Sequence, residues 1–311
     1  MDTITEQVQS QSDARSESEH VPMPWVKIAW FSALLVGVYF PILRKLVDQW
    51  MTDDDVSHGF FVPIVAGYIA WQRRETLLRL PSKPAWWGLG LLVWSGLQSY
   101  VGVLGAELFL QRTAFLEALL GVLLILGGTA LIRELIFPLL LLPFMIPIPA
   151  VIYNQITFPL QLFASQVAEI CLMLINIPVL REGNVLELAS QKLSVAEACS
   201  GIRSLLMLTF LSLVYAYVFD KKVWMRWALF FCTIPIAILS NAGRVTITGI
   251  LSEIDPELAT GVFHETEGFV IFGIALVMLA ATHWAINWVI SLRHTPDLPT
   301  DDMSDDASQA A

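Results

Sequence analysis

The chain has 311 residues, of which 56% are hydrophobic and 15% are charged. Soluble domains carry about 25% charged residues, so this composition excludes an ordinary soluble enzyme and a disordered chain. The formal net charge is −10, but residues 1–24 and 295–311 together hold ten carboxylates and one arginine. The acidity therefore belongs to two polar tails, which is typical of a membrane protein with solvated ends.

Apolar segments of about 20 residues, the length that crosses a membrane, recur along the chain. They are residues 28–47, 85–103, 108–132, 134–152, 201–219, 227–250 and 267–290. The shorter segment 57–71 crosses only if its polar start lies at the interface. In 153–180, polar residues recur at mostly helical spacing, which favours an interfacial or re-entrant helix. The segments predict an all-α polytopic membrane protein with about eight transmembrane helices and one such extra helix.

The lysines and arginines of the loops predict the orientation, because these residues are retained on the cytoplasmic side. They gather at four places: 73–83, Arg133, 221–226 and Arg293. If all four are inside, both termini are cytoplasmic, and 181–200 and 251–266 are on the outer face. Arg44 and Lys45 do not fit this arrangement. It gives acidic disordered cytoplasmic tails at 1–24 and 294–311 around a single transmembrane domain at 25–293.

An alternation of apolar with polar or small residues at 185–188 and 193–196 predicts a short β-hairpin on the outer face. Its second strand leads directly into EACSG (197–201), where the next spanning helix begins. Cys199 therefore lies at a helix N-terminus, where backbone N–H groups and the helix dipole stabilise a thiolate. Arg203, four residues on, adds a positive charge to the same helical face.

Two further polar features are expected on the same side of the membrane. Asn241 and Arg244 share a face of the span 227–250, and Arg244 is about 9 Å below its outer end. A charged residue at that depth faces a protein interior or a wet cavity and is a functional candidate. His264 lies in the outer loop before the last span. No group of residues has the spacing of a metal site, and no cofactor is expected.

These residue types have a joint chemical meaning. A thiolate attacks a carbonyl group, an imidazole transfers protons near neutral pH, and a guanidinium stabilises an oxyanion or a thiolate. A cysteine, a histidine and an arginine at one face of the membrane therefore indicate acyl transfer from a peptide bond.

Three motifs resemble those of the exosortase family, which are Gram-negative membrane transpeptidases: EACSGIRS (197–204), NAGR (241–244) and HETEG (264–268). SHGFFVP (57–63) and FMIPIP (144–149) are similar to further family features, so the resemblance extends over most of residues 28–290.

In that family a cysteine is the proposed nucleophile, and an arginine and a histidine complete the site. The matching positions are Cys199, Arg244 and His264. The resemblance implies a cysteine transpeptidase or protease of the bacterial inner membrane, with its active site on the periplasmic side.

The resemblance also implies the partners, which are exported proteins with a C-terminal Pro-Glu-Pro-type motif, a hydrophobic helix and a basic end. Cleavage next to the motif, through a thioester, would release the protein from its anchor. Water, an amine, a sugar or a lipid would then accept the acyl group. Some members carry an extra soluble C-terminal domain linked to exopolysaccharide biosynthesis. Only an acidic tail follows His294, so this domain is not expected here.

Each candidate also has a structural alternative. Cys199 can be an inert small residue, Arg244 can extend to the outer headgroups, and His264 can be an ordinary loop residue. His58, beside three aspartates, suits a structural role and a substrate-docking role equally well. Further supporting residues are Arg203, Asn241 and Glu197, and Glu197 either orients a neighbour or faces water.

The alternative function is a transporter or flippase for an anionic substrate that uses Arg244 and His264. Such a protein often has an inverted repeat and glycine-broken helices at the midplane, which this sequence lacks. Replacing Cys199 with alanine separates the two functions, because a transporter does not need the thiol.

Overall fold

The computed structural model describes residues 23–195, 201–220, 222–255 and 261–293, without the side chains of 201–205 and 261–269. The tails expected at 1–24 and 294–311 lie outside this part, apart from Met23 and Pro24. The stretch that the sequence presents as one transmembrane domain forms two compact units, residues 1–159 and 160–311. Each unit is described by itself below.

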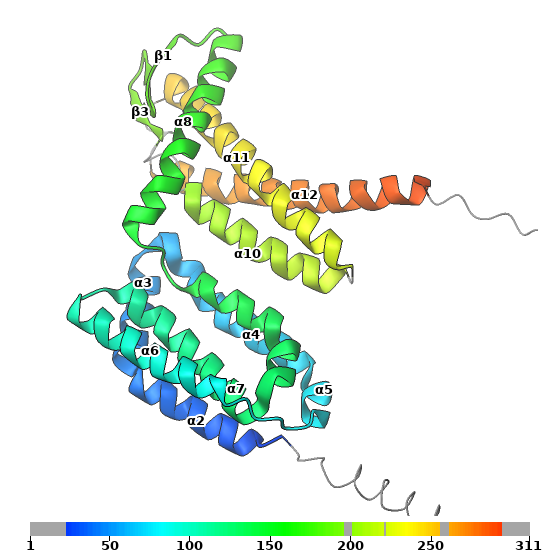
Figure 1. The fold of residues 1–311 in the computed structure, drawn as a ribbon. Helices are drawn as coiled ribbons and strands as arrows, with labels where there is room; N and C mark the ends of the chain where they lie inside the picture. Colours follow the sequence, from blue (N-terminus) through cyan, green and yellow to red (C-terminus); the bar gives the residue numbers. More distant parts are fainter. Residues whose placement is uncertain (1–22, 196–200, 221, 256–260, 294–311) are drawn as a thin grey trace, which may run out of the picture. The chain divides into compact units, whose positions relative to one another are not determined.

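The first unit is built from helices (Figure 1). Its elements are α2 (Trp25–Val38), α3 (Phe40–Thr52), η1 (Asp54–Phe60), α4 (Phe61–Gln72), α5 (Arg74–Arg79), α6 (Trp87–Leu104), α7 (Leu108–Leu141) and η2 (Leu142–Met145). Helix α8 (Ala150–Leu174) begins in this unit and ends in the second. One core of the first unit joins α2, α5 and α7 through buried residues such as Ile28, Leu77 and Leu131.

The first expected span, 28–47, is a bent pair of helices. Helices α2 and α3 meet at Tyr39 at an angle of 72°. Pro41 stands in the first turn of α3, where a proline begins a helix well but cannot continue the preceding one. The next expected span, 57–71, overlaps the end of the 3₁₀ turn η1 and all but the last residue of the 12-residue helix α4. At 1.5 Å per residue, α4 is about 18 Å long, too short to cross a membrane unaided.

The boundaries predicted at 108–132 and 134–152 are also wrong. Helix α7 continues to Leu141 and is broken at Gly128, whose backbone has φ 78° and ψ −172°. The 3₁₀ turn η2 follows, and the proline-containing stretch 146–149 separates it from α8. The sequence placed the break near Arg133, whereas glycine conformation and proline spacing determine where the helices end.

The second unit contains a small sheet and three long helices (Figure 1). The antiparallel strands are β1 (Val179–Glu182), β2 (Val185–Leu188) and β3 (Lys192–Ser194), in that order across the sheet. The helices are α10 (Gly201–Phe219), α11 (Val223–Ile254) and α12 (Gly261–Arg293). Strand β2 pairs with β3 in the register Leu186 to Leu193, at the two segments of the expected hairpin. The additional strand β1 was not predicted.

Segment 153–180, expected as an interfacial or re-entrant helix, lies largely within the 25-residue helix α8. Its length and hydropathy are those of a membrane-spanning helix. Three of the polar residues that suggested an interfacial position are bonded to the sheet or to its β1–β2 turn instead. Ser165 Oγ donates to the Gly183 carbonyl at 2.9 Å, Arg181 Nε donates to Glu169 at 2.7 Å, and Asn184 donates to Gln161 at 3.0 Å. This part of the polar stripe of α8 therefore faces protein, whereas Gln155 and Gln166 are exposed.

Length and hydropathy identify five candidate membrane spans among the described residues, or six if the bent pair α2–α3 is one span. Eight were predicted. The difference arises because α7 counts once, because α4 is short and because only Leu206–Phe219 of α10 is described with side chains, whereas α8 adds a span that was not counted in the prediction. The chain is a predominantly helical polytopic membrane protein, as predicted.

Candidate functional site

The three-stranded sheet holds the chain segment that leads to Cys199. Leu186, Leu193 and Val195 lie in one buried core with Ala168 of α8 and Val245 of α11. In the turn between β2 and β3, the Ser190 amide donates a hydrogen bond of 2.9 Å to Glu253 Oε1, near the end of α11. The strand before EACSG is therefore fixed to two helices.

Leu186→Ala should lower the free energy of unfolding by about 2–3 kcal/mol, because Leu186 is fully buried and its truncation leaves a cavity. Leu180→Ala in neighbouring β1 is the matched control, since Leu180 is 59% exposed. Thermal unfolding of both variants in detergent measures the difference. Equal melting temperatures for the two variants would contradict the packing of the sheet on α8 and α11.

The topology brings three helix ends to one end of the helix bundle. Helices α10, α11 and α12 alternate in direction and pack on one another through Leu208, Ala237, Leu279 and their neighbours. The beginning of α10, the end of α11 and the beginning of α12 therefore lie on the same side (Figure 1). EACSG precedes the first of these ends, and HETEG stands at the start of the third.

A small cavity lies between the three helices. It is lined by one residue of α10, Leu208, by Ser240, Asn241 and Arg244 of α11, and by Ile271, Phe272 and Ala275 of α12. Its volume of about 20 Å³ is room for one water molecule. Arg244 is 8% exposed. Within the described residues, Ser240 Oγ is buried and has no protein hydrogen-bond partner.

Arg244 lies deeper than the sequence indicated. Helix α11 continues to Ile254, ten residues beyond Arg244, so the arginine is about 15 Å below the helix end rather than 9 Å. On the neighbouring helices, Leu208 is seven residues after the start of α10, and Ile271 is ten after the start of α12. The cavity thus lies about 10–15 Å below all three helix ends.

The structure describes only some of the predicted site residues. Cys199 and Glu197 lie outside the described residues. Arg203 is in the first turn of α10 and His264 in the first turn of α12, each as backbone. His264 is thus in a helix rather than in the expected loop. Only Asn241 and Arg244 are brought together with their side chains, at the cavity.

His58 lies in the first unit and is only 3% exposed. It belongs to η1, beside a cluster in which the indole nitrogen of Trp50 donates to the Met145 carbonyl at 3.0 Å. The Trp50 and Phe60 rings also meet edge to face, with centroids 5.1 Å apart. SHGFFVP is thereby packed next to the start of FMIPIP. The burial of His58 favours a structural role over a substrate-docking role.

Sequence reasoning missed a polar network at the opposite end of the three-helix bundle. His283 Nδ1 lies 3.0 Å from the Tyr215 hydroxyl, and His283 Nε2 lies 3.3 Å from Asp220 Oδ2. Both carboxylate oxygens of Asp220 are engaged, since the Lys222 amide donates to the other at 2.7 Å. The network joins α10 to α12. These residues are more than 60 positions apart in the sequence, so no local pattern predicts it.

A buried arginine in the first unit was also missed. Arg112 in α7 is 4% exposed, and its Nε has no hydrogen-bond partner among the described residues. A charged residue inside the apolar segment 108–132 was the available signal.

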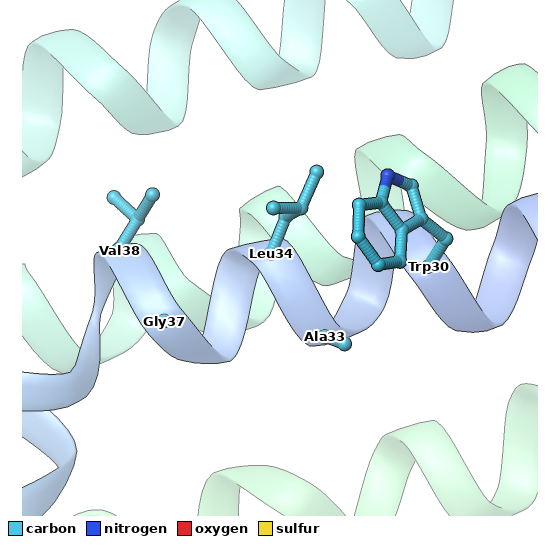
Figure 2. A pocket seen from close by; sticks show the side chains of 5 residues that line it. All are labelled: Trp30, Ala33, Leu34, Gly37 and Val38. Carbon is cyan, nitrogen blue, oxygen red and sulfur yellow. The ribbon is translucent and has the colours of Figure 1, made fainter.

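A second, more open pocket lies on α2 and is mostly apolar. It is lined by Trp30, Ala33, Leu34, Gly37 and Val38 of that single helix. Figure 2 shows Trp30, Leu34 and Val38 projecting from the same side of α2. The indole nitrogen of Trp30 is the one polar side-chain atom among these five residues, and a groove of this composition suits lipid rather than catalysis.

Comparison with protein families supports the resemblance inferred from the motifs. The family described as transmembrane exosortase (Exosortase_EpsH) matches residues 50–281, about three quarters of the chain. The match includes EACSGIRS, NAGR and HETEG as well as the cluster at Trp50 and Met145. Searches of curated proteins and of solved structures gave no significant match. The chain therefore belongs to the transmembrane exosortase family.

Proposed function

We propose that the protein is a membrane-embedded cysteine transpeptidase or protease of the bacterial inner membrane. It cleaves exported proteins next to a Pro-Glu-Pro-type motif in their C-terminal tails, at the periplasmic face. Cys199 is the nucleophile, Arg244 stabilises the oxyanion or the thiolate, and His264 is the general acid and base. Arg203, Asn241 and Glu197 have supporting roles, whereas the buried His58 has a structural role in the first unit.

The observation that carries the proposal is the position of the three motifs on the helix bundle. The last four residues of EACSGIRS begin α10, NAGR lies in α11 and HETEG in the start of α12, and the start of α10, the end of α11 and the start of α12 lie together. Arg244 is buried between the same three helices. A buried arginine in a membrane protein is a functional candidate, and a helix N-terminus favours a thiolate.

The reaction proceeds through a thioester. The Cys199 thiolate attacks the carbonyl carbon of the cleaved bond, and the negative charge moves to the carbonyl oxygen. When the tetrahedral intermediate collapses, the carbon–nitrogen bond breaks and His264 donates a proton to the leaving amine. Water or another nucleophile then gives its proton to His264 and attacks the thioester, and the cysteine leaves as a thiolate. A positive guanidinium lowers the energy of both tetrahedral intermediates.

The depth of Arg244 bears on where the substrate lies. The backbone of Arg244 lies about 15 Å below the end of α11, whereas Cys199 precedes the first turn of α10 in the sequence. The substrate tail contains a hydrophobic helix, so its anchored part enters the membrane beside the bundle. The bond cleaved by Cys199 lies just above the membrane part of that tail.

Cys199→Ala should abolish processing of a reporter that ends in a Pro-Glu-Pro-type motif, a hydrophobic helix and a basic end. Removal of a nucleophile typically lowers such activity by several orders of magnitude, because no thioester can form. The measurement is the mass of the reporter in membranes that contain wild type or variant. The mass of the wild-type product identifies its new C-terminus and the acceptor.

Cys171→Ala is the matched control. Cys171 is a free, half-buried cysteine of α8, so its replacement should leave processing close to wild type. Processing that survives in Cys199→Ala would end the thiol mechanism. If the wild type fails with this reporter and with native exported proteins, the proposed substrate class is wrong. A transporter that uses Arg244 and His264 would then be tested by uptake of an anionic substrate.

A further inference from the structure

Strand β3 (Lys192–Ser194) lies at one edge of the sheet, and its last residue, Ser194, is five positions before Cys199 in the sequence. The Val195 amide donates to the Asn184 carbonyl at 2.9 Å. This bond shows which of the opposing residue pairs of β2 and β3 are hydrogen-bonded to each other. Hydrogen-bonded and non-hydrogen-bonded pairs alternate in an antiparallel ladder, so the backbone groups of Lys192 and Ser194 point away from β2. Within the described part of the chain, no hydrogen bond to these groups is found.

An edge with alternating unpaired N–H and C=O groups binds an extended peptide by adding it as a strand. Such binding takes its affinity from the main chain and its specificity from side chains on the two faces. The edge of β3 is continuous with the segment that contains Cys199. A peptide paired with β3 would therefore lie beside the strand that directly precedes the nucleophile's motif in the sequence.

The side chains of β3 define the two faces of this edge. Leu193 is buried against α8 and α11, whereas the Lys192 side chain is on the opposite face and is 66% exposed. Lys192 Nζ lies 3.0 Å from Glu187 Oε1, and this hydrogen bond and charge raise the pKa of Lys192. Lys192 is therefore a cation at neutral pH, with β2 on one side and the outer edge on the other.

We propose that the outer edge of β3 binds the substrate segment next to the cleaved bond as an added strand, with an acidic residue opposite Lys192. This inference rests on the proposed function. A Pro-Glu-Pro segment has the required pattern, since only the central residue has an N–H group. The central residue can exchange hydrogen bonds with Lys192 while both prolines direct their nitrogens away from the sheet.

The test is a charge exchange between Lys192 and the central residue of the reporter motif. Lys192→Glu should slow processing of the Pro-Glu-Pro reporter about fivefold, because an opposite-charge cross-strand pair becomes a like-charge pair. Changing the motif to Pro-Lys-Pro should slow the wild-type enzyme by a similar factor. The two changes together should restore most of the rate. Lys83→Glu, at an exposed loop position of the first unit, is the matched control for net charge.

A second pair of reporters tests the main-chain hydrogen bonds independently of charge. Pro-Gln-Pro retains the central N–H group and loses the charge, so its processing should no longer respond to Lys192→Glu. Pro-Pro-Pro loses the N–H group as well, and its processing should fall much further than that of Pro-Gln-Pro.

The outcomes separate the two levels of the proposal. If wild type processes the reporter and Cys199→Ala does not, the proposed function stands whatever the Lys192 variants do. Independent effects of Lys192→Glu and Pro-Lys-Pro, with no recovery in combination, would overturn the binding edge. Equal processing of Pro-Gln-Pro and Pro-Pro-Pro would overturn strand addition. Western blotting of the membranes confirms that each variant accumulates.

Discussion

Arg244→Ala should reduce reporter processing at least about 100-fold, the usual loss when one donor that stabilises an oxyanion is removed. Arg244 is 8% exposed and lies between α10, α11 and α12, so no other described cation lines the same cavity. Arg244→Lys should recover only part of the rate. A lysine retains the charge but lacks the planar, five-donor guanidinium. The initial rate of reporter shortening, per amount of membrane-inserted protein, measures both effects.

The control for this prediction is Ser240→Ala, which changes the same cavity one helical turn away and should have a processing rate close to wild type. Because an arginine this deeply buried also affects packing, thermal unfolding of each variant accompanies the rates. An Arg244→Ala protein that unfolds like wild type and processes the reporter normally would remove Arg244 from the mechanism.

Gly128→Ala should destabilise the first unit by about 4 kcal/mol. The backbone of Gly128, at φ 78° and ψ −172°, lies in a region that is essentially restricted to glycine, at a cost of about 1–3 kcal/mol for other residues. An added Cβ would also overlap the carbonyl oxygen of Lys83, which pairs with Gly128 in a β-bridge. Backbone atoms cannot move aside as a flexible side chain can, so overpacking adds a similar cost.

Gly90→Ala in α6 is the matched control, since its Cβ would meet no atom within 4 Å and alanine favours a helix. Thermal unfolding in detergent and the yield of membrane-inserted protein measure the difference between the two variants. A Gly128→Ala protein as stable as Gly90→Ala would show that the break in α7 does not need glycine.

The sequence predicted the class of fold better than the limits of its helices. Mean hydropathy identifies apolar segments well because the membrane core requires about 20 such residues. It does not report backbone direction, so the bend at Tyr39 and the break at Gly128 were not foreseen. The polar stripe of α8 was misread for a related reason. Hydropathy shows that Ser165 and Glu169 are polar, but only tertiary structure shows that they face β1 and Gly183.

The candidate site was predicted through motifs rather than through periodicity. A charged residue within an apolar helix already indicated Arg244, and the structure places it in a cavity with Asn241. Its depth was underestimated because the end of α11 extends to Ile254 through the polar residues Ser252 and Glu253. Contacts between distant segments, such as Tyr215 with His283, have no local signal in one sequence.

The packing of Trp50 against η1 has a consequence for the evolution of the family. A Cβ on Gly59 would overlap the Trp50 indole ring, and that ring donates its hydrogen bond to the Met145 carbonyl. Positions 50 and 59 are therefore not free to vary separately. Lineages that keep tryptophan at position 50 should retain glycine at 59, and a larger residue at 59 should occur only with a smaller one at 50. An alignment of exosortases would contain this constraint as a correlated pair.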